Sequence, residues 1–205
     1  MLVLSHRGYW KRADEKNKEM AFRRSLDFGF GIETDIRDCG GQLLISHDMV
    51  QGTEMTLVDL LTIFGNKKLT LALNIKADGL VSQLKKIMQT FVTIDWFVFD
   101  MSIPDMRAYL QAGLPVFTRM SEVEKEPAWL EQSVGVLLDA FSETWYNANF
   151  VDTLLQSGKR VCIVSSELHG RKFESLWRML LAIPKHSGLM LCTDYPEKAR
   201  DFFGE

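Results

Sequence analysis

Short apolar segments alternate with longer amphipathic segments along the chain. Most of the short segments are continuous hydrophobic runs, which is typical of parallel strands covered on both faces. Between them, apolar residues recur at helical spacing, as at Ile103, Met106 and Leu110. The strands that this pattern predicts are Leu2–Ser5, Gly31–Ile36, Leu69–Ile75, Trp96–Asp100, Pro115–Thr118, Gly135–Asp139, Arg160–Val164 and Gly188–Cys192.

Eight strands with intervening helices indicate a βα-repeating fold, for which two architectures compete. An open doubly wound sheet calls for a glycine-rich phosphate loop after its first strand, and the chain offers none. A closed barrel fits the strand count, although 205 residues lie near its lower size limit of about 200. We therefore predict an α/β fold, a single compact (β/α)8 TIM barrel over residues 1–205, with Leu2–Ser5 hydrogen-bonded to the last strand.

Composition narrows the choice of partners. The 24 Lys and Arg residues against 27 Asp and Glu leave a net charge of −3, which gives no electrostatic case for nucleic acid. No apolar run approaches the roughly 18 residues of a membrane span, so we expect no membrane insertion. The N-terminus lacks a basic segment of the signal-peptide kind, which predicts a cytoplasmic location. The composition does not indicate an oligomeric state.

Polar residues cluster where the predicted strands end. His6 and Arg7 follow the first strand, and Asn74 and Lys76 end the third. Because the carboxyl ends of parallel strands meet on one face, these groups are expected to converge there. Gly40-Gly41, between two apolar runs, predicts a hairpin that folds a further residue, His47, back over the same face.

Glu33 and Asp35 are the most informative pair. A strand alternates sides with period two, so both carboxylates point the same way. Two such carboxylates would repel and protonate unless a cation lies between them, and hard divalent ions favour carboxylate oxygens. The alternative is a pair of solvated acids on an edge strand.

Two histidines beside a carboxylate pair suggest proton transfer. His6 and His47 can act as base and acid in one reaction, whereas a lone histidine is more often structural. Arg7 can bind phosphate oxygens bidentately, and Lys76 can add a point charge. His169 and Arg171, after the seventh strand, fit either the barrel mouth or an exposed loop.

These residues resemble the motifs of the glycerophosphodiester phosphodiesterase family, within the phosphatidylinositol-phospholipase-C-like superfamily. Four motifs in order carry the resemblance, together with Asn17 followed by Ala21-Phe22. They are Ser5-His6-Arg7-Gly8, Gly31-Ile-Glu33-Thr-Asp35-Ile, Ile45-Ser-His47-Asp48 and Cys192-Thr-Asp194-Tyr-Pro196.

The resemblance implies a phosphodiesterase of lipid metabolism acting on a small-molecule phosphodiester. It implies catalysis by His6 and His47, and phosphate binding by Arg7 with Lys76. It also implies a divalent cation, Mg²⁺ or Ca²⁺ with Mn²⁺ as a further candidate, on Glu33 and Asp35. In this family a neighbouring hydroxyl of the substrate is thought to attack phosphorus, which gives a cyclic phosphate that water opens.

The chain departs from the family pattern at two places that affect the site. The third strand reads Asn74-Ile-Lys76 where the family usually carries Glu-x-Lys, so Asn74 would be a neutral third ligand with lower metal affinity. The inserted small domain is nearly absent, because Thr56 begins a helix eight residues after Asp48. Two other functions stay open: a non-catalytic phosphate-binding barrel derived from this family, and a different metal-assisted barrel hydrolase. The retained histidine pair argues against the first, and the absence of His-x-His on the first strand argues against the second.

Overall fold

The computed structural model describes residues 1–204, in which strands alternate with helices. The strands are β1 (Leu2–His6), β2 (Gly31–Cys39), β3 (Gln42–Ile45), β4 (Thr70–Ile75), β5 (Asp95–Phe99), β6 (Phe117–Met120), β7 (Gly135–Leu138), β8 (Arg160–Val164) and β9 (Leu189–Thr193). The α-helices are α1 (Glu19–Asp27), α2 (Leu57–Phe64), α3 (Val81–Met88), α4 (Ile103–Gln111), α5 (Ala148–Gln156), α6 (Glu174–Leu180) and α7 (Pro196–Phe203). Two short 3₁₀ helices are η1 (Ala13–Glu15) and η2 (Ser166–His169).

The hydrogen-bonded strand order is β5-β4-β2-β1-β9-β8-β7-β6, and β3 pairs with β2 outside this path. Val116, just before β6, forms a parallel bridge with Val98 of β5. This order is that of a (β/α)8 barrel and not of an open doubly wound sheet. The predicted fold class is therefore confirmed, as is the pairing of the first strand with the last.

Contacts divide the chain into two units: Ser5–Val116, and Met1–Leu4 together with the chain from Phe117 onward. The single domain over residues 1–205 stays a prediction. No helix in the described part of the chain is both long and apolar enough to cross a membrane.

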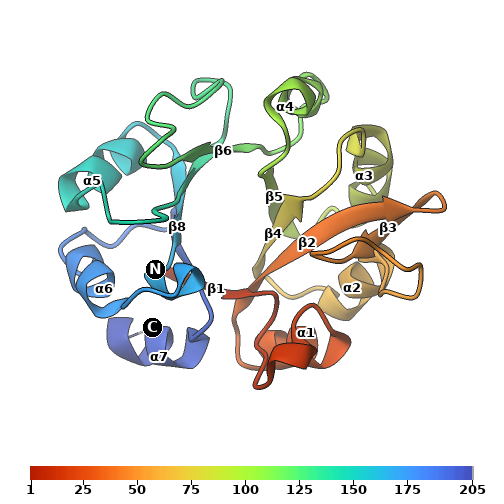
Figure 1. Cartoon of the computed structure of the whole chain (residues 1–205), viewed down its shortest axis with the longest axis horizontal. Coiled ribbons are helices and arrows are strands. Elements are labelled where there is room, and N and C mark those ends of the chain that lie inside the picture. Colours follow the sequence, from red (N-terminus) through yellow and green to blue (C-terminus); the bar gives the residue numbers. More distant parts are fainter. Residues whose placement is uncertain (205) are drawn as a thin grey trace. The chain divides into compact units, whose positions relative to one another are not determined.

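In the unit Ser5–Val116, β2 and β4 form a parallel pair (Figure 1). Ile32 lies opposite Leu71 in this register, and both are fully buried. The same register places Asp35 beside Asn74. The apolar positions anchor both strands, so the polar side chains near their carboxyl ends are held at fixed positions.

The hairpin predicted from Gly40-Gly41 is present. β2 and β3 are antiparallel, with Ile36 opposite Ile45, and both glycines have positive φ angles of 57° and 78°. Such angles favour glycine because it lacks a Cβ atom. The chain leaving β3 therefore returns alongside the end of β2, where the amide of Ser46 donates to the carbonyl of Asp35 over 3.1 Å.

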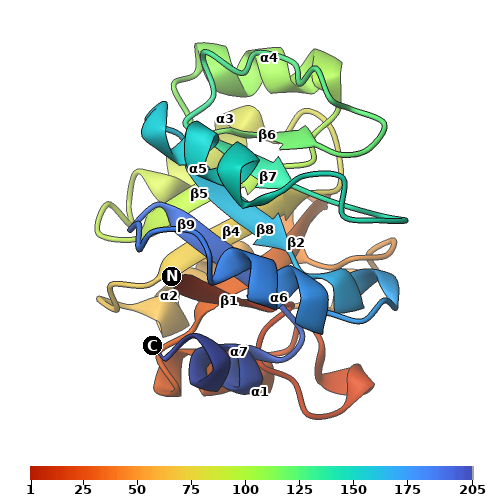
Figure 2. The same cartoon turned by 90° about the vertical axis from the view of Figure 1, so that its left-hand side faces the viewer.

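In the other unit, β6, β7, β8 and β9 form consecutive parallel pairs, with α5 packed against β8 (Figure 2). The buried indole of Trp177 on α6 donates to the hydroxyl of Ser165 over 2.8 Å. The predicted strand at Pro115–Thr118 is displaced by two residues, because Pro115 has no amide hydrogen and Val116 forms only the isolated bridge.

Candidate active site

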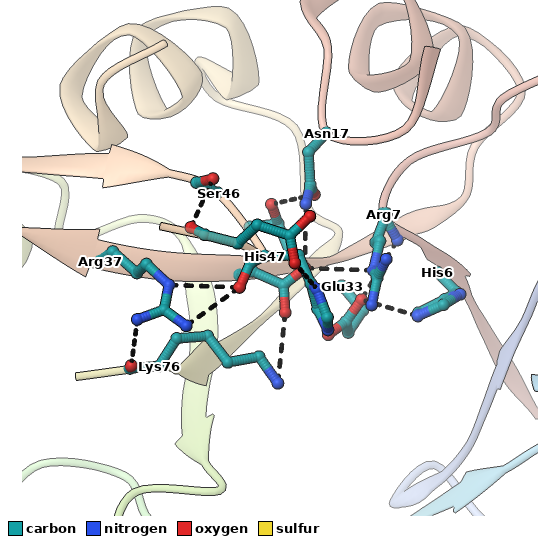
Figure 3. Close-up of polar contacts among 11 residues, drawn as sticks. His6, Arg7, Asn17, Glu33, Arg37, Ser46, His47 and Lys76 are labelled. Atoms are coloured by element: carbon teal, nitrogen blue, oxygen red, sulfur yellow. Dashed lines mark hydrogen bonds and ion pairs between the residues drawn. The ribbon is translucent and has the colours of Figure 1, made fainter. Parts of the chain in front are cut away.

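The candidate site lies within the unit Ser5–Val116 and is centred on the two carboxylates of β2 (Figure 3). Glu33 and Asp35 are 4% and 1% exposed. Their period-two spacing in an extended strand puts them on one side, as predicted. The alternative of solvated surface acids is therefore wrong.

Glu33 carries an unusual carboxyl group. Burial, followed by the nearby Asp35 carboxylate, raises its pKa from the ordinary 4.5 to about 7, against opposing effects of His6 and Arg7. The Arg7 amide donates to Oε2 over 3.1 Å, and Nε2 of His6 lies 4.0 Å from the same oxygen. His6, with 16% of its side chain exposed, thus lies beside a carboxyl group that can gain or lose a proton near neutral pH.

The turn after β1 positions His6 and Arg7. Arg7 and Gly8 both have left-handed backbone conformations, with φ angles of 56° and 80°. A Cβ atom on Gly8 would lie only 2.9 Å from the Cβ of Ala21. Glycine is therefore required at this position by both conformation and space, which accounts for the glycine that follows His6 and Arg7.

Asp35 is surrounded by cationic and amide groups. Its Oδ2 lies 3.1 Å from Nε of Arg7 and accepts a hydrogen bond of 2.9 Å from Nδ2 of Asn17. Its Oδ1 lies 3.5 Å from Nζ of Lys76. Arg7 and Lys76, the predicted phosphate ligands, are therefore both brought to the carboxylate pair and remain about one-fifth exposed.

Asn17 has a larger part in the site than sequence reasoning assigned to it. Its backbone is left-handed, with a φ angle of 58°, and its backbone N–H donates to the Arg7 carbonyl over 2.9 Å. The Thr34 hydroxyl donates to Oδ1 of Asn17 over 2.8 Å, which orients its amide nitrogen toward Asp35. The motif resemblance named this residue, but no local pattern assigned it a contact.

His47 lies in the loop after β3, next to the end of β2. Its Nδ1 is 2.9 Å from Oδ1 of Asp48, and its side chain is 43% exposed. Hydrogen bonding to His47, followed by its charge, lowers the pKa of the Asp48 carboxyl, with smaller effects from Arg7 and Arg37. Among residues 1–204, His47 makes its side-chain hydrogen bond through Nδ1, and Nε2 makes none.

The residues present fit a hard cation. Oδ1 of Asp35 and Oδ1 of Asn74 are buried and accept no hydrogen bond from any described residue. Both are oxygen atoms of the kind that Mg²⁺ and Ca²⁺ prefer. The pKa of Glu33 is raised first by burial and then by the neighbouring Asp35 carboxylate, whose repulsion a cation would relieve. Within residues 1–204 no group of three or more His, Cys, Asp or Glu side chains could hold a metal ion. The lower metal affinity expected from Asn74 stays a prediction.

Comparisons with known proteins find matches among solved structures only: no family model matches the chain, and no curated protein sequence does. A glycerophosphodiester phosphodiesterase from Agrobacterium tumefaciens superposes with a TM-score of 0.72 over 100% of both chains, at 13% identity. A glycerophosphoryl diester phosphodiesterase from Parabacteroides distasonis gives 0.57 over 99% of this chain and 86% of that one, at 13% identity.

A Ca²⁺-dependent phosphatidylinositol-specific phospholipase C from Streptomyces antibioticus gives a TM-score of 0.56 over 98% of this chain and 95% of its own, at 12% identity. At such identities the likeness shows the fold. The chain therefore has the same fold as these three enzymes, and this is the barrel fold that the motif resemblance implied.

Proposed function

We propose, from the fold that this chain shares with phosphodiesterases, that it hydrolyses a glycerophosphodiester-like small molecule by paired-histidine acid–base catalysis. The observation that carries the proposal is the buried carboxylate pair with His6 and two basic side chains at its edge. His47 lies in the adjoining loop. Acidic and basic side chains that lie close together suit a reaction in which one oxygen loses a proton and another oxygen gains one.

The two histidines have different surroundings, which suits different tasks. Nε2 of His6 faces Glu33 at 4.0 Å, whereas His47 is held through Nδ1 by the exposed Asp48. In the proposed reaction one histidine takes the proton from a hydroxyl of the substrate as its oxygen bonds to phosphorus. The other gives a proton to the leaving alcohol oxygen as its bond to phosphorus breaks, and water then opens the cyclic phosphate.

The proposal includes a divalent cation, Mg²⁺ or Ca²⁺ with Mn²⁺ as a further candidate, held by Glu33, Asp35 and Asn74. When bound, such an ion supplies positive charge that stabilises the phosphorane-like transition state. We assign the phosphate oxygens to Arg7 and Lys76, and the exposed part of each side chain beside Asp35 supports this assignment. Their ion pairs with Asp35 hold the two cationic groups in position before substrate binds.

One experiment tests this function. The purified chain is incubated with a panel of glycerophosphodiesters and sugar-phosphate diesters, with each divalent ion or with EDTA, and products are followed by ³¹P NMR. We expect metal-dependent turnover of at least one diester. The alternative, a non-catalytic phosphate-binding barrel, predicts that glycerol 3-phosphate binds in calorimetry while no diester is turned over under any metal condition.

A further inference from the structure

Arg37 joins two segments of the candidate site through their backbone. It lies on β2, two residues beyond Asp35, and its Nε and Nη2 donate to the His47 carbonyl over 3.2 and 3.1 Å. Its Nη1 donates to the Lys76 carbonyl over 2.8 Å. Figure 3 shows this guanidinium between the His47 loop and the strand end that carries Lys76.

The two carbonyls lie where the regular strands have ended. His47 is two residues past the end of β3, and Lys76 is the first residue after β4. Backbone carbonyls beyond a strand lose their ladder partners and need other donors. A guanidinium presents several N–H groups in a rigid planar fork, so one side chain can donate to both.

The position of these contacts suggests their purpose. The two residues whose carbonyls accept from Arg37 are His47 and Lys76. His47 is a proposed catalytic residue, and Lys76 is a proposed phosphate-binding residue. His47 is 43% exposed, and its only side-chain hydrogen bond among residues 1–204 is to Asp48, itself 93% exposed. The hydrogen bonds of Arg37 to the His47 carbonyl, together with those of Ser46 to the carbonyls of Asp35 and Asp48, therefore fix the backbone from which the His47 imidazole extends.

We propose that Arg37 is a positioning residue, which fixes His47 and Lys76 relative to Glu33 and Asp35 without touching the substrate. This inference rests on the proposed function. It goes beyond that function because it assigns a task to a residue that the reaction itself does not require.

The test uses Arg37→Lys and Arg37→Gln in the full chain, with Arg23→Gln as the matched control. Arg23 is an exposed arginine on α1, and its one partner among residues 1–204 is Glu19, at 2.7 Å. Lysine keeps the positive charge but loses the fork, so it separates geometry from charge. We expect kcat to fall about 10²-fold in both Arg37 variants, the cost of a small misplacement of a catalytic group, with KM changed much less. Arg23→Gln is expected to keep parental kinetics.

A second measurement reads the position of His47 without turnover. Imidazole resonances of His47 in two-dimensional NMR, and amide hydrogen exchange over residues 46–49, are compared among the variants. We expect shifted His47 signals and faster exchange in the Arg37 variants only, with the melting temperature within a few degrees of the parent.

Three results would overturn the proposal. The first is a parental kcat in Arg37→Gln, and the second is a parental kcat in Arg37→Lys. The third is an Arg37 variant that has lost activity while its His47 resonances and amide exchange are unchanged. If the parent turns over no diester, the proposed function fails, and unperturbed His47 signals in Arg37→Gln would then overturn the positioning role separately.

Discussion

Replacing Glu33 with Gln should change the pH dependence of stability in the metal-free protein. Burial and the adjacent Asp35 carboxylate raise the pKa of Glu33 from 4.5 to about 7 in the folded chain. On unfolding, the side chain enters water and regains its ordinary pKa. Glutamine resembles the protonated carboxyl in shape, can still accept the Arg7 amide hydrogen bond, and does not titrate.

The direction follows from proton binding. Between pH 4.5 and about 7 the folded chain keeps a proton on Glu33 that the unfolded chain has released. The contribution of this group to stability is fully present below pH 4.5 and is lost as pH rises through about 7. A pKa difference of about 2.5 corresponds to about 3 kcal/mol, since one pKa unit is worth about 1.4 kcal/mol.

Urea unfolding, followed by circular dichroism in EDTA from about pH 4 to about pH 8, measures this effect. Other titrating groups act in both proteins, so the difference between Glu33→Gln and the parent isolates Glu33. We expect the variant to gain about 3 kcal/mol relative to the parent across this range. The exposed Glu126, replaced by Gln, serves as the matched control for the loss of one carboxylate.

Parallel stability curves for Glu33→Gln and the parent would refute the reasoning. They would mean that Glu33 has the same pKa in the folded and unfolded chain. The buried carboxylate pair would then be compensated by charge, and its fit to a divalent cation would lose its main electrostatic support.

Three further predictions concern the candidate cation site, the turn after β1, and a buried ion pair in the other unit. Asn74→Glu adds a third carboxylate to the candidate cation site. Because affinity rises with ligand charge, we expect Mg²⁺ or Ca²⁺ to bind at least about tenfold more tightly in calorimetry. Equal affinity would place Asn74 outside the metal's ligands. Gly8→Ala should lower the free energy of unfolding in urea by about 3 kcal/mol, because residue 8 has a left-handed φ and the added Cβ would lie 2.9 Å from the Cβ of Ala21. Parental stability would contradict that geometry. His169→Ala removes the hydrogen bond of 2.6 Å between Nε2 of His169 and the buried Asp139 carboxylate. We expect the free energy of unfolding in urea to fall by about 1–3 kcal/mol. No loss would show that this hydrogen bond does not stabilise the fold.

The fold was predictable because its signal is local and repeated. Continuous apolar runs such as Leu71–Leu73 identify strands covered on both faces, and eight of them with intervening helices leave few topologies. The displacement of β6 shows the limit of this signal. Periodicity cannot tell that Val116 makes one bridge while the ladder starts a residue later.

Part of the site was predictable for the same reason. Period two places Glu33 and Asp35 together, and the two-glycine turn returns His47 to the end of β2. Arg37 could not be assigned a role, because it acts on backbone carbonyls, and any residue type can supply a carbonyl. The contact of Asn17 with Asp35 depends on a left-handed turn and a loop, neither of which leaves a periodic trace.

The hydrolysis of a glycerophosphodiester by the parent and by His47→Ala tests the central proposal most directly. Both proteins are supplied with the divalent ion that the panel selects, and ³¹P NMR follows the substrate, the cyclic phosphate and the final monoester. The account predicts that the parent consumes the diester and that His47→Ala does so about 10²–10⁴-fold more slowly, with unchanged folding and metal binding. Hydrolysis by His47→Ala at the parental rate would contradict it.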